Sequence, residues 1–142
     1  MNKRALTLIG IMLTTSVLAE DVDETQDAQA DGSVDIFNLS GSIEVIGWDR
    51  SQIRVTGEIG DDIEELIFHV SGSQTKIKVK IPDRVHGHKD VSADLVIHVP
   101  AASSIDVGSV SADIDVEKVT GEQELQSVSG DLEIEIYASD VD

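Results

Sequence analysis

Residues Ala102–Tyr137 read ASSIDVGSV SADIDVEKV TGEQELQSV SGDLEIEIY, which is four consecutive blocks of nine residues. Each block opens with small or turn-forming residues and then alternates apolar with polar side chains. A fixed period of this kind is typical of stacked architectures, because one short strand cannot bury its apolar face alone. The repeat therefore predicts the fold and says much less about function.

The same alternation covers most of the chain before the repeat. Period-two patterning and β-branched residues predict ten short strands, which are Val34–Leu39, Ser42–Ile46, Gln52–Glu58, Leu66–Val70, Lys76–Ile81, Asp94–Val99, Ser104–Val107, Asp113–Val116, Gln123–Gln126 and Asp131–Ile136. Ser-Gly pairs, single glycines and two prolines separate them. We expect an all-β domain of stacked short strands, either a β-solenoid similar to a β-helix or a two-sheet β-sandwich.

The apolar slots of the blocks predict the core. We expect the buried side chains to include Ile43, Val45, Ile53, Val55, Ile105, Val107, Ile114, Val116, Leu125, Leu132 and Ile134. The only tryptophan, Trp48, fills the ninth slot of an earlier block, SGSIEVIGW (Ser40–Trp48), and is expected to cap this core. The alternative is an exposed ring that stacks on a sugar or anchors a partner.

The first nineteen residues have the pattern of a secretory signal peptide. Lys3 and Arg4 form the charged region, Ala5–Leu13 is apolar, and Ala19 precedes the expected cleavage site. The apolar run is shorter than the roughly 20 residues that span a bilayer. We therefore expect cleavage and release to the periplasm or the cell exterior, with no stable membrane insertion afterwards; an uncleaved anchor is the alternative. The chain has no cysteine, which excludes a lipoprotein anchor and disulfides.

Residues 20–32, EDVDETQDAQADG, are acidic and poor in apolar side chains, so we expect a flexible leader there. Residues 33–142 form the β-strand-repeat domain. The whole chain has 28 acidic and 10 basic side chains and a formal charge of −18, which becomes −20 if Lys3 and Arg4 are removed with the signal peptide. Such a surface repels phosphates, so nucleic acid and anionic lipid are excluded as expected partners.

Three segments carry a recurrent Ser-Val-Ser-Gly-Asp pattern in whole or in part: SVSGDLEI (Ser127–Ile134), SVSADIDV (Ser109–Val116) and NLSGSIEV (Asn38–Val45). With the strand-then-proline piece Asp94–Pro100, they make residues 33–136 resemble a bacterial adhesin-type domain, a β-strand-repeat family of otherwise unknown function. The resemblance implies an exported protein with a solenoid-like stack of short strands. It also implies further repeats, so a chain ending at Asp142 is expected to lack some of them.

Acidic side chains recur on the polar positions of the blocks, and stacking would align them about 4.8 Å apart. These residues are Asp113, Asp115, Glu117, Glu122, Glu124, Asp131, Glu133 and Glu135. A calcium site needs six to eight converging oxygens, and the blocks lack the glycine-rich turns of calcium-binding nonapeptide repeats. We expect a solvated acidic face on which divalent cations act only as weak counterions.

The other residues with catalytic or ligand chemistry form no convincing site. His86, His88 and Asp90 supply only part of a zinc site, which needs three or four ligands; we interpret them as an exposed turn. His69 and His98 lie on separate predicted strands, and Asp83 with Arg84 is at most an ion pair in a loop. No nucleophile stands beside a base in a known motif. The sequence thus predicts no enzyme and no catalytic, cofactor-binding or metal-binding residue.

Two functions remain open. The first is an adhesin-like binding module of the cell envelope or surface that engages a protein or polysaccharide through its faces and strand edges. The alternative is a structural envelope protein that self-assembles end to end through the same edges. The acidic side chains of the last predicted strand oppose edge-to-edge pairing of copies, which favours the first function.

Overall fold

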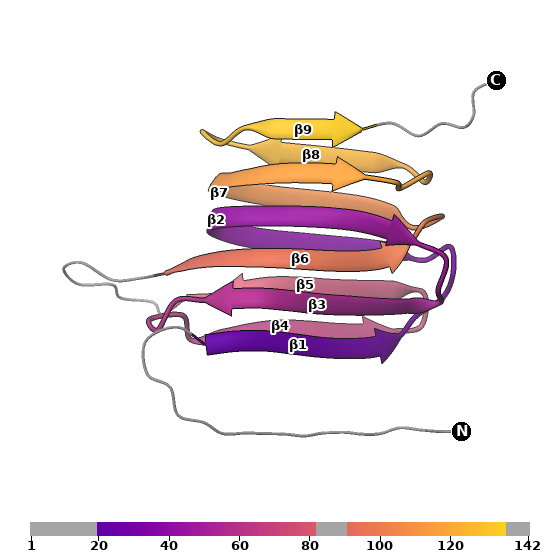
Figure 1. Ribbon diagram of the computed structural model, residues 1–142, viewed down its shortest axis with the longest axis horizontal. Coiled ribbons are helices and arrows are strands. Elements are labelled where there is room, and N and C mark those ends of the chain that lie inside the picture. Colours follow the sequence, from indigo (N-terminus) through magenta and orange to yellow (C-terminus); the bar gives the residue numbers. More distant parts are fainter. Residues whose placement is uncertain (1–19, 82–90, 136–142) are drawn as a thin grey trace.

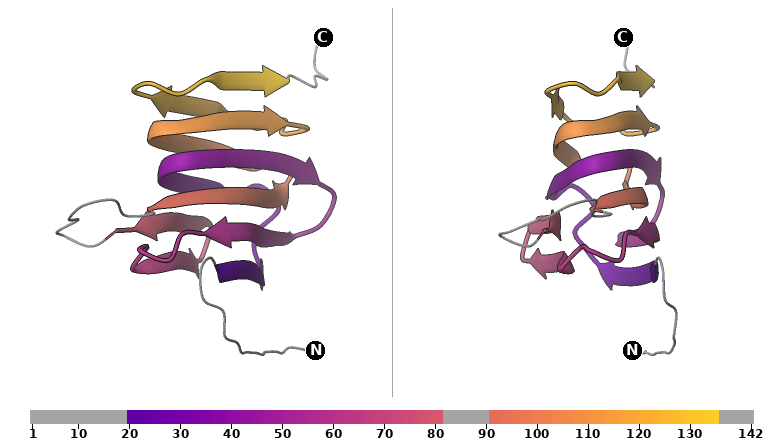
Figure 2. Two further views of the ribbon diagram at one scale, coloured as in Figure 1. Left: turned by 60° about the vertical axis from the view of Figure 1, so that its left-hand side comes forward. Right: turned by 90° about the vertical axis from the view of Figure 1, so that its left-hand side faces the viewer.

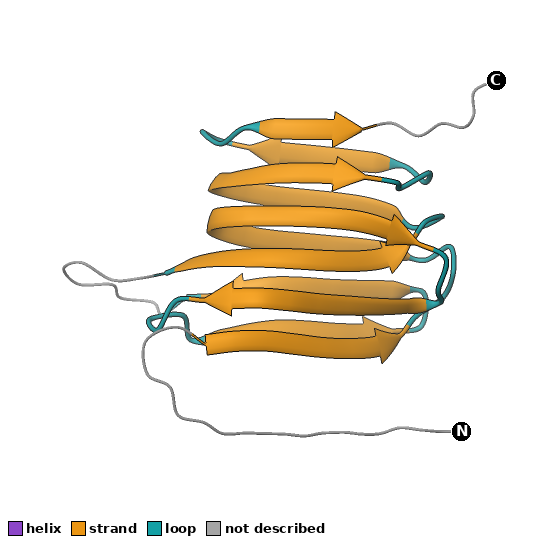
Figure 3. Ribbon diagram, in the orientation of Figure 1, coloured by secondary structure: helices purple, strands orange, loops and turns teal. Residues whose placement is uncertain are grey.

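The computed structural model describes residues 20–81 and 91–135, which form nine strands and contain no helix (Figures 1 and 3). The strands are β1 (Glu20–Asp27), β2 (Ser33–Trp48), β3 (Gln52–Ile59), β4 (Glu65–Ser71), β5 (Gln74–Lys80), β6 (Ser92–Pro100), β7 (Ser104–Glu117), β8 (Gln123–Ser127) and β9 (Leu132–Glu135). The predicted all-β class is confirmed. In these residues there is accordingly no helix that could cross a membrane.

The strands lie in two facing layers that share their two longest members (Figure 2). Residues 33–37 of β2 pair with β5, whereas residues 40–48 pair with β6, so β2 passes from one layer into the other. β7 follows β2 residue by residue and bends in the same way, pairing first with β8 and then with β9. The first layer is β4-β5-β2-β7-β8 and the second is β1-β3-β6-β2-β7-β9.

The register shows how the nine-residue blocks are used. Ile105 pairs with Gln123 and Ile114 pairs with Leu132, both in parallel, so paired residues lie 18 positions apart. Each nine-residue block therefore contributes one strand segment to one layer. Alternate blocks, and not consecutive ones, lie side by side.

The core fills the space between the layers with aliphatic side chains. Alternate residues of each strand point inward, as a period of two requires. The largest side chains with almost no exposed surface are Ile43, Ile53, Ile77, Leu95, Ile97, Ile114, Val34, Val45, Val55, Val79, Val99 and Val107. Full burial of one such side chain contributes about 1.5–3 kcal/mol relative to its exposure.

The structure confirms eight of the predicted core residues as buried, namely Ile43, Val45, Ile53, Val55, Ile105, Val107, Ile114 and Val116. Leu125 is only partly buried. The prediction is wrong for Leu132 and Ile134, which are 46% and 44% exposed. They occupy inward positions on β9, but no further strand of the described residues covers that side of β9.

Residues 20–27 form strand β1, where the sequence predicts a flexible leader. β1 runs antiparallel to β3, from Glu20 opposite Ile59 to Asp27 opposite Gln52. Asp21, Asp23, Glu24 and Asp27 are exposed, so the backbone can pair without burying these charges. Hydrogen bonds from Arg54 on β3 lower the pKa of Asp23 on β1 and join the two strands at 3.0 Å.

Two pairs of predicted strands are continuous in the structure. The prediction of separate strands at residues 34–39 and 42–46 is corrected to one strand, β2, and the pairs at 104–107 and 113–116 merge into β7. The small residues at the block boundary allow a bend, at which the register of β2 with β7 omits Leu39 and Val110 and resumes at Ser40 and Ser111. At Gly41 the bend has φ = 109°, and a Cβ atom there would overlap the Ala93 carbonyl.

Candidate functional site

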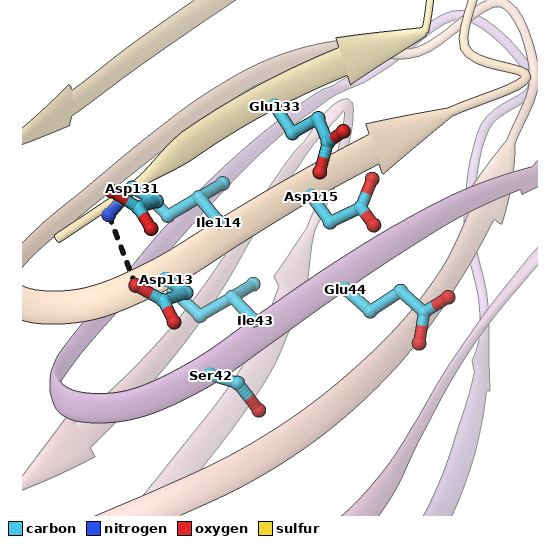
Figure 4. A pocket seen from close by; sticks show the side chains of 8 residues that line it. All are labelled: Ser42, Ile43, Glu44, Asp113, Ile114, Asp115, Asp131 and Glu133. Atoms are coloured by element: carbon cyan, nitrogen blue, oxygen red, sulfur yellow. Dashed lines mark hydrogen bonds between the residues drawn. The ribbon is translucent and has the colours of Figure 1, made fainter.

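The outward side of the second layer carries aligned carboxylates, which we call the acidic face. One row consists of Glu44, Asp115 and Glu133, which are register partners on β2, β7 and β9. The neighbouring row is Ser42, Asp113 and Asp131, and the two rows line a shallow depression (Figure 4). Strand pairing sets their spacing at about 4.8 Å from one strand to the next.

Part of this face has a structural role. The Asp113 carboxylate accepts a hydrogen bond from the Asp131 backbone N–H at 2.9 Å, which fixes the start of β9 (Figure 4). Ser42 donates to the Asp94 carboxylate at 3.0 Å. Two ion pairs form within residues 20–81 and 91–135, Arg54–Asp23 and Lys80–Glu64, and neither includes a carboxylate of these two rows.

Parallel rows of carboxylates are poorly suited to enclose a cation. A calcium ion takes six to eight oxygens that converge on one point, whereas these side chains project from strands in the same direction. In the described part of the chain, no three histidine, cysteine, aspartate or glutamate side chains are placed to hold a metal ion. What the acidic face supplies is a negative potential that attracts cations and basic surfaces.

The predicted single row of acidic side chains is wrong in one respect. Glu124 lies beside Asp106 in the first layer, and Asp106 in turn lies beside Asp35. Glu124 is therefore separated from Asp115 and Glu133 by the core. The prediction assumes that consecutive blocks lie side by side, whereas the bend of β7 sends consecutive blocks to opposite layers.

Trp48 lies on the outside of the second layer, so the expectation that it caps the core is also wrong. Its ring stands 4.9 Å from that of His98, and Arg50 lies over it at 5.1 Å. The Trp48 indole N–H donates to the Gln52 carbonyl at 2.7 Å. The ninth block position does not have one orientation: Val119 is 1% exposed, whereas Val128 is 79% exposed.

The two histidines of the described residues, His69 and His98, lie in different layers. Burial lowers the pKa of His98, the charge of Arg54 lowers it further, and the Glu44 carboxylate opposes this effect. His69 is exposed on β4, in the other layer. The remaining sequence candidates, His86, His88, Asp90, Asp83 and Arg84, lie outside the described residues.

The two ends of the stack differ. At the end formed by β8 and β9, which we call the open end, the large apolar side chains that remain exposed are Val110, Val128, Leu132 and Ile134. Within the described residues, β8 and β9 each pair with β7 alone, so each has one unpaired edge (Figure 1). The sequence predicts an edge strand at residues 131–136, but it also predicts that the apolar side chains of this strand are buried.

At the opposite end, which we call the capped end, β1 and β4 close the core. The Gln26 side-chain amide on β1 donates to the Phe68 carbonyl on β4 at 2.8 Å, which links the two layers. Val22, Ile63 and Leu66 pack against the core from this side. Exposed apolar surface and free strand edges therefore coincide only at the open end of the described structure.

The fold resembles solved bacterial structures, although no protein-family model and no curated protein sequence matches the chain. A "putative cell adhesion protein" of Clostridium sporogenes superposes with a TM-score of 0.55 at 10% identity, over 78% of this chain and 59% of that one. A "putative lipid binding protein" of Parabacteroides distasonis gives 0.51 at 12%, over 80% and 51%. A "putative adhesin" of Bacteroides fragilis gives 0.51 at 12%, over 81% and 53%.

At these identities the similarity concerns the fold alone. The chain spans between half and three fifths of the length of these three structures.

Proposed function

We propose that the chain is an exported, non-catalytic and adhesin-like module of the cell envelope or surface, which binds a protein or polysaccharide through its open end. The observation that carries this proposal is the coincidence of unpaired strand edges with exposed Leu132 and Ile134 at that end. Strand edges recognise partners by backbone pairing, and apolar side chains beside them add contact area. The signal-like residues 1–19 and the names given to two of the similar structures support export and adhesion.

The architecture is best interpreted as a flattened β-solenoid. Two features support this over a sandwich of separate sheets. β2 and β7 each run through both layers and pair in parallel with their neighbours, and β8 and β9 pair with β7 at the same offset of 18 residues. A solenoid grows by adding coils at its ends, so the last coil of the described residues is a natural place for association.

The packed interior favours a partner that binds at a strand edge, and not a small ligand enclosed between the two layers. Val45, Ile97 and Val107 have no exposed surface, and the inward positions around them are filled in the same way. One similar structure is described as a lipid-binding protein, but the packed core of this chain favours recognition on the outside.

A cosedimentation experiment tests the proposal. The purified chain is mixed with envelope fragments of its source organism, and the bound fraction is compared with that of the double variant Leu132→Glu/Ile134→Glu. We expect the bound fraction to fall at least about tenfold, the equivalent of 1.4 kcal/mol. The control Thr25→Glu/His69→Glu changes two exposed residues at the capped end in the same way and should bind normally. Equal binding by all three chains, or no binding by any, would refute the proposal.

Self-assembly is the alternative function, and the same open edges support it. Size-exclusion chromatography at low and high salt separates the two functions. Copies joined end to end would bring acidic strands together, so polymers should appear when salt screens that repulsion. A monomer at both salt concentrations favours the binding module.

A further inference from the structure

We propose that the free edge of β9 binds an extended partner segment in which apolar residues alternate with lysine or arginine. The inference rests on the proposed function, because it specifies the chemistry of the partner at the open end. Three properties of the edge define that segment: the direction of its backbone groups, its exposed apolar side chains and the charge of its outward face.

The backbone groups of Leu132 and Ile134 point toward the free edge. On the other side of β9, the Ile114 N–H donates to the Asp131 carbonyl at 2.8 Å, and Asp131 N–H donates to the Asp113 side chain. Backbone groups of successive residues in a strand alternate in direction, so Asp131 and Glu133 face β7. Leu132 and Ile134 thus offer N–H donors and C=O acceptors to a further strand.

The apolar side chains show what such a strand would cover. Leu132 and Ile134 are register partners of Ile114 and Val116, which are 1% and 0% exposed because β9 lies beside them. One more strand would shield Leu132 and Ile134 in the same manner. The bound segment therefore needs apolar side chains at every second position, on its inward side.

The outward positions of the segment would meet the acidic face. Glu133 is the exposed end of the row that continues through Asp115 to Glu44. Lysine or arginine at the outward positions would lie one strand spacing from Glu133, and cross-strand pairs of opposite charge stabilise a sheet. An acidic segment would be repelled for the same reason.

A strand of this kind already pairs in parallel with β2 within the chain. β5 reads Lys76-Ile77-Lys78-Val79-Lys80, and Lys76 lies opposite Asp35 of β2 in the first layer. Ile77 and Val79 of β5 are buried, whereas its lysines are exposed. A second copy joined through β9 would instead bring Glu133 near the carboxylates of its partner, which makes a basic segment the better occupant.

The test uses a labelled peptide, QTKIKVKI, which copies residues 74–81, and measures its binding to the purified chain by fluorescence anisotropy. The control peptides are QTEIEVEI, in which lysine is replaced by glutamate, and QTKKIVKI, in which the alternation is disrupted. We expect the first peptide to bind at least about tenfold more tightly than either control. Equal binding of all three peptides would overturn the proposal.

Variants of the chain then locate the site. Ile134→Pro removes an N–H that faces the free edge, a position at which a strand tolerates proline, and should weaken binding of the lysine peptide at least about tenfold. Ile134→Val keeps the N–H and should bind as the unchanged chain does. Binding that depends only on net charge would be insensitive to Ile134→Pro, and that result would overturn the proposal.

A charge reversal keeps the test decisive if Ile134→Pro disturbs β9. Glu133→Lys should weaken binding of the lysine peptide and strengthen binding of the glutamate peptide. Glu58→Lys makes the same change at an exposed position of β3, on the same layer but away from the edge, and should alter neither. Loss of affinity in both variants alike would contradict the placement at β9.

The outcome also separates this inference from the proposed function. If envelope fragments bind through the open end but the lysine peptide shows no preference, the partner chemistry is wrong and the binding function stands. If the chain forms dimers that exclude the peptide, a second copy occupies the edge and the proposal is overturned. If neither envelope nor peptide binds, both are wrong.

Discussion

Asn38 is a fully buried polar residue at the point where β2 bends from one layer into the other. Its side-chain amide donates to the Ala93 carbonyl on β6 at 2.8 Å. Its register partner on β7 is Ser109, which is also buried and donates to the Ala112 carbonyl at 3.1 Å. Polar side chains from β2 and β7 thus donate hydrogen bonds to backbone carbonyls at both bends.

Replacement of Asn38 by leucine should therefore destabilise the fold. The variant keeps a similar volume but removes the buried hydrogen bond to the Ala93 carbonyl, and the loss of one such hydrogen bond costs about 0.5–1.5 kcal/mol. Urea denaturation of Asn38→Leu should show this loss in the free energy of unfolding. Ser111→Ala, which removes an exposed hydroxyl near the same bend, should change it by less than about 0.5 kcal/mol. An unchanged stability in Asn38→Leu would show that the hydrogen bond to Ala93 contributes nothing.

His98 predicts a pH dependence of stability. Its pKa is lowered from 6.5 in the folded chain, chiefly by burial, so below pH 6.5 the unfolded chain binds more protons than the folded chain. Stability must then fall as the pH decreases through this window. In His98→Gln the decrease in free energy of unfolding between pH 7.5 and 5.5 should be smaller than in the unchanged chain. His69→Gln, which removes an exposed imidazole, serves as the control; the same decrease in all three chains would contradict the prediction.

Among the elements, β2 and β7 determine the architecture because they belong to both layers. Gly41 allows β2 to bend, with φ = 109° and the Ala93 carbonyl so close that a Cβ atom would overlap it. Gly108 on β7 has a normal φ, and a Cβ atom there would lie 3.6 Å from Phe37, an ordinary contact distance. The bend therefore requires glycine at position 41, whereas position 108 has room for a side chain.

Gly41→Ala should lower the free energy of unfolding by about 2 kcal/mol or more, through backbone strain and the overlap with Ala93. Gly108→Ala should leave it unchanged or raise it by up to about 1 kcal/mol, because alanine restricts the unfolded chain. Thermal denaturation followed by circular dichroism measures both effects. Similar melting temperatures for the two variants would show that the bend does not depend on Gly41.

The individual strands were predictable from sequence, because alternation of apolar and polar residues records which side chains face the core. Ile43, Val45, Ile114 and Val116 follow that rule and are buried. Which strands pair with one another was harder to predict from the sequence. Alternation is the same whether consecutive blocks or alternate blocks pair, so nothing in it places Glu124 in a different layer from Asp115.

Edges were harder still to predict. The residues of β9 have the pattern of a core strand, and their 44–46% exposure follows only from the position of β9 at the end of the stack. Conversely, β1 has few apolar residues and its pattern indicates a flexible segment. It is held by backbone pairing with β3 and by Arg54, which are long-range contacts that composition does not record.

At the scale of the whole molecule, charge is the dominant feature. The chain carries a formal charge of −18, and mutual repulsion on a small domain opposes compaction when little salt is present. We expect the melting temperature to rise with ionic strength, and sodium chloride and calcium chloride at matched ionic strength to raise it by similar amounts. Stoichiometric calcium binding tighter than about 10⁻⁴ M in calorimetry would contradict this and assign a metal site to the acidic face.

The constant offset between paired strands restricts how the length of such a chain can change. Residues 18 positions apart lie side by side on β7 and β8 and on β7 and β9. Loss of a single nine-residue block would send every later block to the opposite layer, where its neighbours differ in orientation and in their bends. Loss or gain of two blocks would preserve each contact. We therefore expect insertions and deletions in the repeat to be tolerated in steps of two blocks, and shorter ones to fall in the connections between strands.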